Sequence, residues 1–372
     1  MILFELIGGV SLCIWIYLLA ARGGFWLMRE SPAPVSRAAR KSVAVVIPAR
    51  NEEAVVGQAV ASLLNQDYPG NIHVFLVDDH SIDATVAAAG VSERLTVVQA
   101  GPLPAGWTGK LWAVSEGLKR VEAMKPDYVL LTDADIVHAP GNLAGLVARA
   151  EAGSFDLVSY MVQLQCRTLA ERALIPAFVF FFFKLYPPSW IARRDRQTAG
   201  AAGGCMLIRP AALARIGGIA AIRGELIDDC ALARAIKPGG GIWLGLTHSA
   251  RSIRDYTTFA EIRRMISRTA FTQLRHSALL LAGTIIGLAV IYLAPALLAL
   301  TGDRLAVGLG LTAWILMIVS YIPTLRFYER SWAWALLLPF IALFYMYATV
   351  DSAVRYWTGR GGLWKDRVQD AA

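Results

Sequence analysis

Cysteine, histidine and charged residues are scarce in this sequence. Its 372 residues include four cysteines and five histidines, and Asp, Glu, Lys and Arg together make up only 17%. The cysteines stand far apart, without a Cys-x-x-Cys pair: Cys13, Cys166, Cys205 and Cys230. This spacing argues against a disulfide framework or a zinc site, and we expect reduced, buried thiols.

Internal repeats and RNA-binding motifs are also absent. The net charge is +8, which in a soluble protein would suggest nucleic acid as a partner. The basic residues instead flank apolar segments and crowd residues 251–275, where they suit anionic lipid headgroups and a diphosphate. We therefore expect a membrane partner and no nucleic acid.

Apolar residues are abundant, at 56% of the chain with a mean hydropathy of +0.49. Four segments are long enough to cross a hydrocarbon core of about 30 Å: residues 2–21, 278–300, 305–325 and 332–350. They predict four parts of the chain: an N-terminal anchor with a basic linker (1–41), one large domain (42–277), C-terminal transmembrane segments (278–351) and a basic tail (352–372).

Charges beside the first segment predict its orientation. The segment lacks a basic leader and is longer than a signal-peptide core, so we expect an uncleaved anchor; the alternative is a cleaved signal before a secreted domain. Five basic residues follow it, against Glu30 alone: Arg22, Arg29, Arg37, Arg40 and Lys41. The positive-inside rule then puts the N-terminus outside and the large domain in the cytoplasm.

The basic tail conflicts with four crossings, which would leave the C-terminus outside. Its bases favour the cytoplasm: Arg355, Arg360, Lys365 and Arg367. Residues 278–300, which contain Pro295, are the candidate for a segment that dips in and returns, but their length favours an ordinary crossing. A further apolar stretch at 174–192 is interrupted by Lys184 and two prolines. It is too short to span, so we expect it at the bilayer interface; the alternative is a buried helix of the large domain.

Within the large domain, short apolar runs alternate with helical patterns. Runs rich in Val, Ile and Leu suit strands that are buried on both faces: residues 43–47, 72–77, 95–98 and 128–132. Stretches with helical spacing lie at 54–64, 83–89, 110–123 and 142–150. This alternation predicts an α/β sheet with right-handed crossovers, and ligands of such sheets bind beyond the carboxyl ends of the strands.

Acidic residues gather at those strand ends. Asp78 and Asp79 follow the second run, and Asp133 and Asp135 follow the fourth. Unpaired acids at one edge repel one another unless a cation or hydrogen-bond donors lie among them. Asp133 and Asp135 suit a divalent metal, Mg²⁺ or Mn²⁺, whose shell is completed by substrate phosphates. Such an ion would neutralise the charge on a departing nucleoside diphosphate.

Other polar residues near these ends suggest contacts with a nucleotide. Asp78 and Asp79 can accept hydrogen bonds from a nucleobase or ribose, and Glu52 is expected to face the nucleotide. Ser81 and Asp83 are expected only to cap the following helix.

Three later features suggest group transfer. Lys110 opens a predicted helix near the phosphates, or is merely a solvated lysine. Of the pair Asp228 and Asp229, one can cap a helix and the other can deprotonate an acceptor hydroxyl. Gly203 and Gly204 would let a sugar or an acceptor approach the backbone.

Two arginines further along share a helix face. Arg264 and Arg268 stand four apart and can meet a diphosphate with bidentate hydrogen bonds. The alternative is a lipid-facing basic stripe.

Together these motifs resemble the large inverting glycosyltransferase family, family 2, that includes ceramide glucosyltransferase, cellulose synthase and dolichol-phosphate mannose synthase. The resemblance covers about residues 42–275 and rests on Pro48–Glu53, Val77–Asp83, Gly109–Lys110, Asp133–Asp135 and Asp228–Asp229. It implies a glycosyltransferase A-type domain with a Rossmann-like mixed sheet. It also implies Asp229 as the base, and the position of Asp228 suits it better as the helix cap. The donor would be bound by Pro48, Glu52, Asp78, Asp79, Lys110, Asp133, Arg264 and Arg268.

The chain is most similar to the hopene-associated glycosyltransferases, partly through the stretch 107–112. Where some relatives have an acceptor-site tryptophan, Met265 follows Arg264. The resemblance implies transfer from a uridine-linked sugar to a lipid hydroxyl, in hopanoid biosynthesis at a bacterial inner membrane. Rival acceptors are a polyprenyl phosphate and a ceramide-type lipid. A non-catalytic membrane scaffold, the rival of another class, would have broken acidic motifs.

Overall fold

The computed structural model describes residues 1–31, 40–361, 363–364 and 367–368. The described chain forms two compact units. The helical unit contains Met1–Arg29, Cys166–Ser189 and Tyr256–Gly361, and the sheet unit contains Glu30–Gln165 and Trp190–Asp255. The predicted domain 42–277 is therefore not one continuous block, because its residues 166–189 and 256–277 group with the apolar helices. Arg37, Lys365 and the last tail residues lie outside the described residues.

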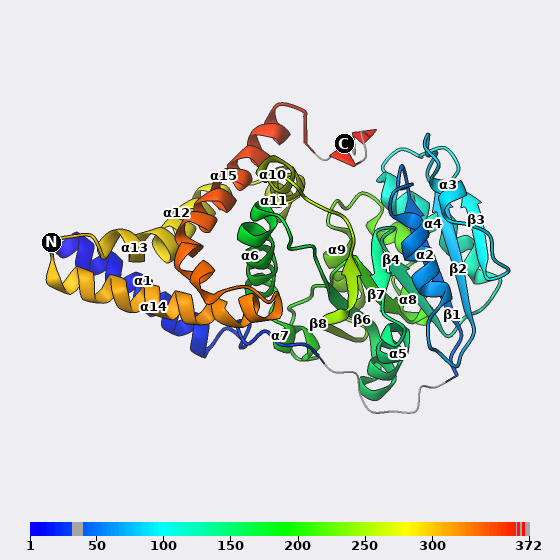
Figure 1. Ribbon diagram of the computed structural model, residues 1–372, viewed down its shortest axis with the longest axis horizontal. Coiled ribbons are helices and arrows are strands. Elements are labelled where there is room, and N and C mark those ends of the chain that lie inside the picture. The colour runs from blue at the N-terminus through cyan, green and yellow to red at the C-terminus, as the bar shows by residue number, and fades with distance from the viewer. Residues whose placement is uncertain (32–39, 362, 365–366, 369–372) are drawn as a thin grey trace. The chain divides into compact units, whose positions relative to one another are not determined.

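The sheet unit is built on a mixed sheet, which among the described residues has eight strands in the order β3-β2-β1-β4-β7-β6-β8-β5. The four predicted strands are confirmed and run parallel: β1 (Val43–Ala49), β2 (Ile72–Asp78), β3 (Leu95–Gln99) and β4 (Tyr128–Thr132). The other half contains β5 (Ile136–His138), β6 (Phe155–Gln163), β7 (Cys205–Ile208) and β8 (Gly241–Ser252). There β7 is antiparallel to both β4 and β6, whereas β8 is parallel to β6 (Figure 1).

Helices cover both faces of this sheet. Val43, Val45 and Ile47 of β1 share a core with α2 (Val56–Leu64) and α5 (Asn142–Gly153). Val46, which points the opposite way, lies against α4 (Gly109–Glu122) at Gly117. Burial on both faces explains why the strand is apolar throughout. The predicted helices are confirmed with ends shifted by up to three residues, and the short elements are α3 (Thr85–Ala88), α8 (Pro210–Arg215), η1 (Ile219–Ile222) and α9 (Asp228–Ile236).

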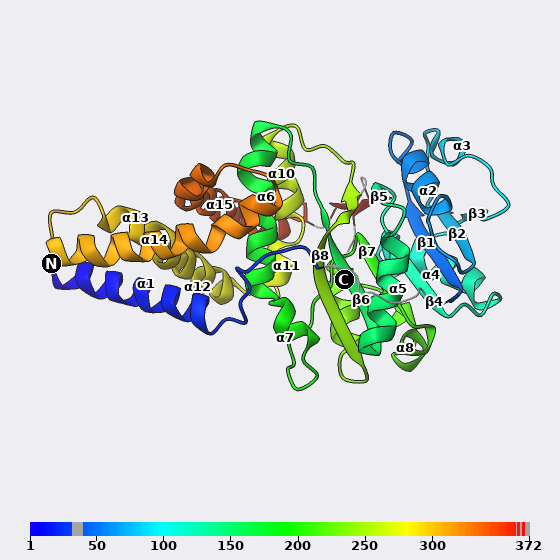
Figure 2. The ribbon, with the colours of Figure 1, turned by 60° about the horizontal axis from the view of Figure 1, so that its bottom comes forward.

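The helical unit contains the long apolar helices. Its elements are α1 (Ile2–Ala20), α6 (Leu169–Leu185), α10 (Phe259–Ser267), α11 (Ala270–Gln273), α12 (Ala278–Leu288), η2 (Ala289–Leu293), α13 (Ala294–Leu298), α14 (Arg304–Phe327), η3 (Trp332–Leu337) and α15 (Leu338–Trp357). Helices α1, α13 and α14 lie side by side in both views (Figures 1 and 2). Among the described residues, five stretches are long and apolar enough to cross a membrane: Ile2–Ala20, Leu169–Ala192, Ala278–Leu298, Arg304–Phe327 and Trp332–Trp357.

The second of these stretches corrects one prediction and constrains another. Helix α6 begins at Leu169, earlier than expected, and with α7 (Pro188–Ala192) gives 24 residues, so the stretch is not too short to span. However, β6 precedes it and β7 follows it, and these strands pair in one sheet. A single crossing would put the paired strands on opposite sides of a membrane, so both ends of α6 must lie on one side. Helix α6 belongs to the helical unit and is largely buried, so the alternative of a buried helix of the large domain stays a prediction.

The stretch 278–298 is helical throughout. Helix α12 passes through the π-turn η2 into α13 without a reversal. The 21 residues of the whole stretch span about 31 Å at 1.5 Å per residue. Pro295 lacks an N–H and cannot bond to the carbonyl of Ile291; the buried indole of Trp15 on α1 donates to that carbonyl at 2.8 Å. This helix therefore suits an ordinary crossing, while the number of crossings and the side of the tail stay predictions.

Candidate active site

The turns after β1 and β2 are joined by hydrogen bonds. The backbone N–H of Asn51 donates to Ser81 Oγ at 3.0 Å, and that of Glu53 donates to Asp83 Oδ2 at 3.2 Å. Asp83 also accepts from the N–H of Thr85, but the N-cap residue of α3 is Ala84 and no side chain caps this helix, so neither Asp83 nor Ser81 is the predicted cap. Asn51 adopts a left-handed backbone, with φ of 52°, which asparagine tolerates. These residues hold the edge of the sheet together.

Asp78 and Asp79 are buried within this edge. The Asp78 carboxylate accepts from the N–H of Ser81 at 3.2 and 3.3 Å. The Asp79 carboxylate is fully buried and lies 3.9 Å from the guanidinium of Arg50, which also donates to the backbone carbonyls of Asp79 and His80. Contact of either acid with a nucleobase or ribose stays a prediction.

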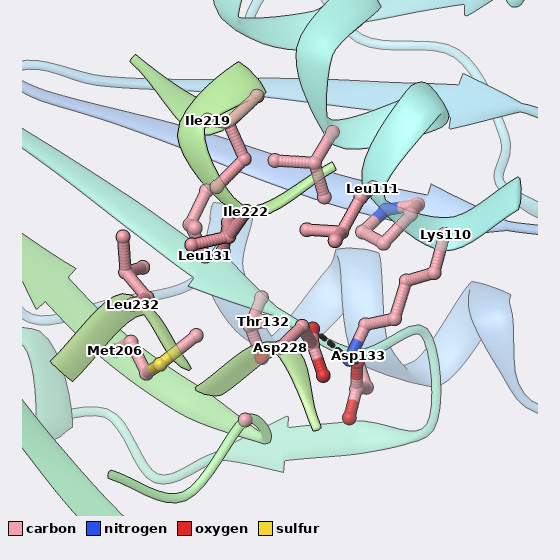
Figure 3. A pocket seen from close by; sticks show the side chains of 13 residues that line it. Lys110, Leu111, Leu131, Thr132, Asp133, Met206, Ile219, Ile222, Asp228 and Leu232 are labelled. Atoms are coloured by element: carbon pink, nitrogen blue, oxygen red, sulfur yellow. Dashed lines mark ion pairs between the residues drawn. The ribbon is translucent and has the colours of Figure 1, made fainter. Parts of the chain in front are cut away.

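Lys110 connects two of the predicted acidic motifs. Thr108 caps α4 by accepting from the N–H of Leu111, which sets Lys110 in the first turn. Its Nζ lies 2.9 Å from Asp133 Oδ1 and 3.0 Å from Asp228 Oδ2 (Figure 3). Burial alone would lower the pKa of Lys110, but the two carboxylates raise it well above its usual range. The lysine is therefore charged and paired, and the solvated alternative is wrong.

The pair at the start of α9 differs from the prediction in one respect. Asp228 is not a helix cap, because the N-cap residue is Ile227 and no side chain caps this helix. The Asp228 carboxylate instead makes a charge-assisted contact with Lys110, which is stronger than a neutral capping bond. Capping therefore does not distinguish Asp229 from Asp228 as the base, and the assignment depends on the surroundings of Asp229.

Asp229 is held by backbone donors beside Lys110. Its Oδ2 accepts from the N–H of Gly203 at 2.8 Å, and its Oδ1 accepts from the N–H of Cys230 at 2.7 Å. Burial and the neighbouring charge of Asp228 raise the pKa of Asp229 to about 6. A Cβ added to Gly203 would lie 3.4 Å from Asp229 Oδ2 and 3.5 Å from Lys110 Nζ, so this glycine lies between the two groups.

Ser252 and Arg254 form a second cluster that the sequence analysis missed. Ser252, at the end of β8, donates to Asp135 Oδ2 at 2.6 Å, and Arg254 Nε lies 3.4 Å from the same oxygen. Arg254 Nη2 donates to both carboxylate oxygens of Glu52 at 2.7 Å. Glu52 is therefore turned toward Arg254, and its contact with a nucleotide stays a prediction. The position of Arg254 just beyond a strand could have marked it as a site residue, but strand β8 was not predicted.

A buried hydrogen-bond chain behind the edge was also missed. The Asn142 amide lies 2.9 Å from His138 Nδ1, and His138 Nε2 lies 3.0 Å from Thr132 Oγ1. Thr132 donates in turn to the carbonyl of Gly204 at 2.7 Å. Burial lowers the pKa of His138 to about 4, so the imidazole is neutral and Nε2 is the donor. The chain ties the residue before Asp133 to the stretch that holds Asp229.

The pocket at this edge has a charged end and an apolar end. Lys110, Asp133 and Asp228 line one end, and Pro48 also contributes to the wall. Figure 3 shows the lysine between the two acids, with apolar side chains above and beside them: Leu131, Met206, Ile219, Ile222 and Leu232. The pocket thus joins a site for charged groups to an apolar surface.

Asp133 and Asp135 fit a divalent cation as part of a larger shell. Within the described ranges, no group of three or more His, Cys, Asp or Glu is placed to hold a metal ion. Two carboxylates are nevertheless what Mg²⁺ takes from a protein when substrate phosphates and water complete its shell. Burial and the charge of Asp135 raise the pKa of Asp133, and Lys110 offsets this only in part. The positive charge of a bound cation would therefore stabilise the carboxylates of Asp133 and Asp135.

Arg264 lies on α10 and Arg268 is the C-cap residue of that helix, in the helical unit, and both side chains are exposed. Thr258 and Glu261 form the capping box that starts this helix. Their role toward a diphosphate stays a prediction, as does the alternative of a lipid-facing stripe.

The mixed sheet, with acids at the carboxyl ends of its parallel strands, is a glycosyltransferase A-type fold. A mannosyltransferase from Pyrobaculum calidifontis, solved in complex with GDP-Man and Mn²⁺, has a similar structure, with a TM-score of 0.57 and 18% sequence identity. The alignment covers 98% of this chain and 100% of that one.

Sequence comparison finds similar proteins for part of the sheet unit. Residues 44–217 match the model of the family described as glycosyl transferase family 2. The beta-monoglucosyldiacylglycerol synthase of Synechocystis sp. is 39% identical over 98 residues, which are 25% of this chain and 19% of that protein. An uncharacterized protein of Methanocaldococcus jannaschii is 26% identical over 131 residues, 35% of this chain and 51% of that protein. This chain thus spans about a fifth of the length of the first of these curated relatives and about half of the length of the second.

Proposed function

We propose that this chain is a membrane-bound, inverting, metal-dependent glycosyltransferase that moves a sugar from a nucleoside diphosphate sugar to a lipid hydroxyl. The match to glycosyl transferase family 2 and the glycosyltransferase A-type fold support the class of reaction. The apolar helices and the name of the Synechocystis relative, a lipid glycosyltransferase, support a lipid acceptor. The expected donor is uridine-linked, and the sheet unit is expected to face the cytoplasm of a bacterial inner membrane.

One observation carries this proposal. Lys110 contacts both Asp133 and Asp228, and Asp229 is anchored beside them by the N–H of Gly203. A proposed metal ligand, a phosphate-binding cation and a base therefore lie at one edge of the sheet. A scaffold without activity gives no reason for a buried cluster with more acids than bases, because such a cluster destabilises the fold.

The geometry supports a single displacement. Asp229, whose pKa is about 6, is mostly ionised at neutral pH and takes the proton of the acceptor hydroxyl. The hydroxyl oxygen forms a bond to the anomeric carbon while the bond from that carbon to the diphosphate oxygen breaks, which inverts the configuration. The electron pair leaves with the nucleoside diphosphate, and Lys110 stabilises its charge. A divalent cation held by Asp133 and Asp135 would supply further charge neutralisation.

For the acceptor we propose a hopanoid lipid, because the chain resembles the hopene-associated glycosyltransferases. A polyprenyl phosphate is already anionic and needs little help from a base, so loss of Asp229 would matter less for that acceptor. A ceramide-type lipid has a hydroxyl and would need the base. Mass spectrometry of lipids from a deletion strain distinguishes these acceptors, since the glycosylated form of the true acceptor should disappear.

Calorimetry of donor binding tests the proposal directly. Binding of uridine diphosphate to the full-length protein in detergent is measured with and without Mn²⁺, for the wild type and for Asp135→Ala. We expect Mn²⁺ to tighten binding in the wild type and to have little effect in the variant. Equal affinity of the two proteins in the presence of Mn²⁺ would contradict the proposed metal site.

A further inference from the structure

Each of the two proposed metal ligands already contacts a basic side chain of the sheet unit. Lys110 Nζ lies 2.9 Å from Asp133 Oδ1, and Arg254 Nε lies 3.4 Å from Asp135 Oδ2. A divalent cation that binds both aspartates would therefore meet two positive charges at close range. Positive charges repel strongly in a partly buried site, where water screens them poorly.

The contacts of the Arg254 guanidinium with Glu52 and with Asp135 differ in strength. Its Nη2 lies 2.7 Å from both oxygens of Glu52, within the range of charge-assisted hydrogen bonds. The 3.4 Å separation from Asp135 is longer than a good hydrogen bond, and Ser252 already donates to the same oxygen at 2.6 Å. Glu52 is thus the anchor of Arg254, and Asp135 is the partner that it can exchange.

A diphosphate supplies the partner for that exchange. Phosphate oxygens match the guanidinium fork and are preferred partners of arginine in proteins. Without a cation, the carboxylates of Asp133 and Asp135 would repel the same phosphates. Without a diphosphate, Arg254 opposes the cation. Each ligand thus removes the obstacle to the other.

We propose that Arg254 is a diphosphate-binding residue that covers Asp135 until the donor arrives, so that metal and nucleotide bind cooperatively. This inference rests on the proposed function and adds to it a donor-site residue and a coupling between ligands. Arg254 keeps its bond to Glu52 and turns its Nε side from Asp135 to a phosphate oxygen. By linkage, the factor by which nucleotide tightens metal binding equals the factor by which metal tightens nucleotide binding.

Calorimetry on the full-length protein in detergent tests this coupling. Mn²⁺ and uridine diphosphate are titrated separately and in each other's presence, with guanosine diphosphate in parallel. The wild type should show a coupling factor within the typical range of roughly 5–150-fold. Arg254→Gln removes the positive charge: it should tighten Mn²⁺ binding to the nucleotide-free protein by about tenfold and weaken nucleotide binding with Mn²⁺ present by a similar factor.

Two further variants control for charge and for folding. Arg254→Lys keeps a positive charge near Asp135, so its Mn²⁺ affinity without nucleotide should stay near that of the wild type. Arg215 forms a comparable pair with Asp156, at 2.6 Å, at the opposite edge of the sheet. Arg215→Gln should leave both affinities and the coupling factor unchanged. Thermal unfolding shows whether each variant is folded before it is titrated.

The outcomes separate this inference from the proposed function. A wild-type coupling factor of one overturns the inference without use of any variant. So does a folded Arg254→Gln protein whose Mn²⁺ affinity is unchanged or weaker, since Arg254 would then not oppose the metal. If the wild type binds neither Mn²⁺ nor a nucleoside diphosphate, the proposed function itself fails.

Discussion

In the helical unit one acid is shared by two bases, whereas around Lys110 and Arg254 in the sheet unit five acids face two bases. Asp351 on α15 lies 3.0 Å from Arg263 and 2.8 Å from Arg355, and it also accepts from Ser267 at 2.8 Å. The sheet edge has Lys110 and Arg254 against a larger set of acids: Glu52, Asp133, Asp135, Asp228 and Asp229.

This difference is the one expected between a structural cluster and a functional site. The charges around Asp351 are satisfied within the protein, so nothing further is required there. At the sheet edge burial, together with the surplus of negative charge, raises the pKa of Asp133 and of Asp229, an energetic cost that stability alone does not justify. A cationic ligand would relieve that cost. Variants in the two clusters should therefore behave differently.

The largest expected effect is on turnover in Asp229→Asn. Loss of a general base typically lowers the rate by about 10²–10⁴-fold. Asp228→Asn, the matched control, removes a partner of Lys110 and should affect donor affinity more than turnover. Turnover is measured by sugar transfer and donor affinity by calorimetry. If Asp228→Asn is inactive while Asp229→Asn turns over normally, the two roles are reversed.

The pH dependence of the rate is expected to follow Asp229. The base works as a carboxylate, and its pKa is raised to about 6 by burial and by Asp228, so activity should be lost as the pH falls through this value. Below it, kcat/KM for the acceptor should decline about tenfold per pH unit, at saturating donor and metal. Asp229→Asn should lack this limb of the profile. An identical limb in the variant would assign the titration to another group.

The smallest effect should come from the helical cluster. Asp351→Asn leaves Arg263 and Arg355 without their carboxylate and should lower the free energy of unfolding by about 1–3 kcal/mol. Urea unfolding of the protein in detergent measures this change. Donor affinity per folded molecule should stay that of the wild type. Lower donor affinity at unchanged stability would show that the helical cluster also serves the site.

Half of the sheet was predictable and half was not, for a physical reason. The parallel strands β1 to β4 are buried on both faces, so each is a continuous apolar run that stands out from its surroundings. Strand β8 mixes apolar, polar and basic residues, and its pairing with β5 joins Ile136 to Ser252 across more than a hundred residues of chain. No local pattern indicates such a distant pairing.

The sequence by itself determined which acidic residues gather at the ends of the parallel strands. Acids that follow apolar strands must meet at one edge of a parallel sheet, so Asp133, Asp135 and the aspartates after β2 could be chosen without coordinates. The membrane-length segments were equally plain, because length and apolarity alone decide whether a helix can span.

Only the tertiary structure decided how those residues are paired. Capping favoured Asp228 as a structural residue, but Lys110 reaches it from α4 and makes it part of the site. Arg254 belongs to the candidate site because β8 ends beside Asp135. A single membrane crossing by α6 is excluded because the strands before and after it, β6 and β7, pair in one sheet. The partner of a side chain, and the side of a membrane on which a helix ends, depend on which segments meet in space. Packing over the whole chain determines those meetings.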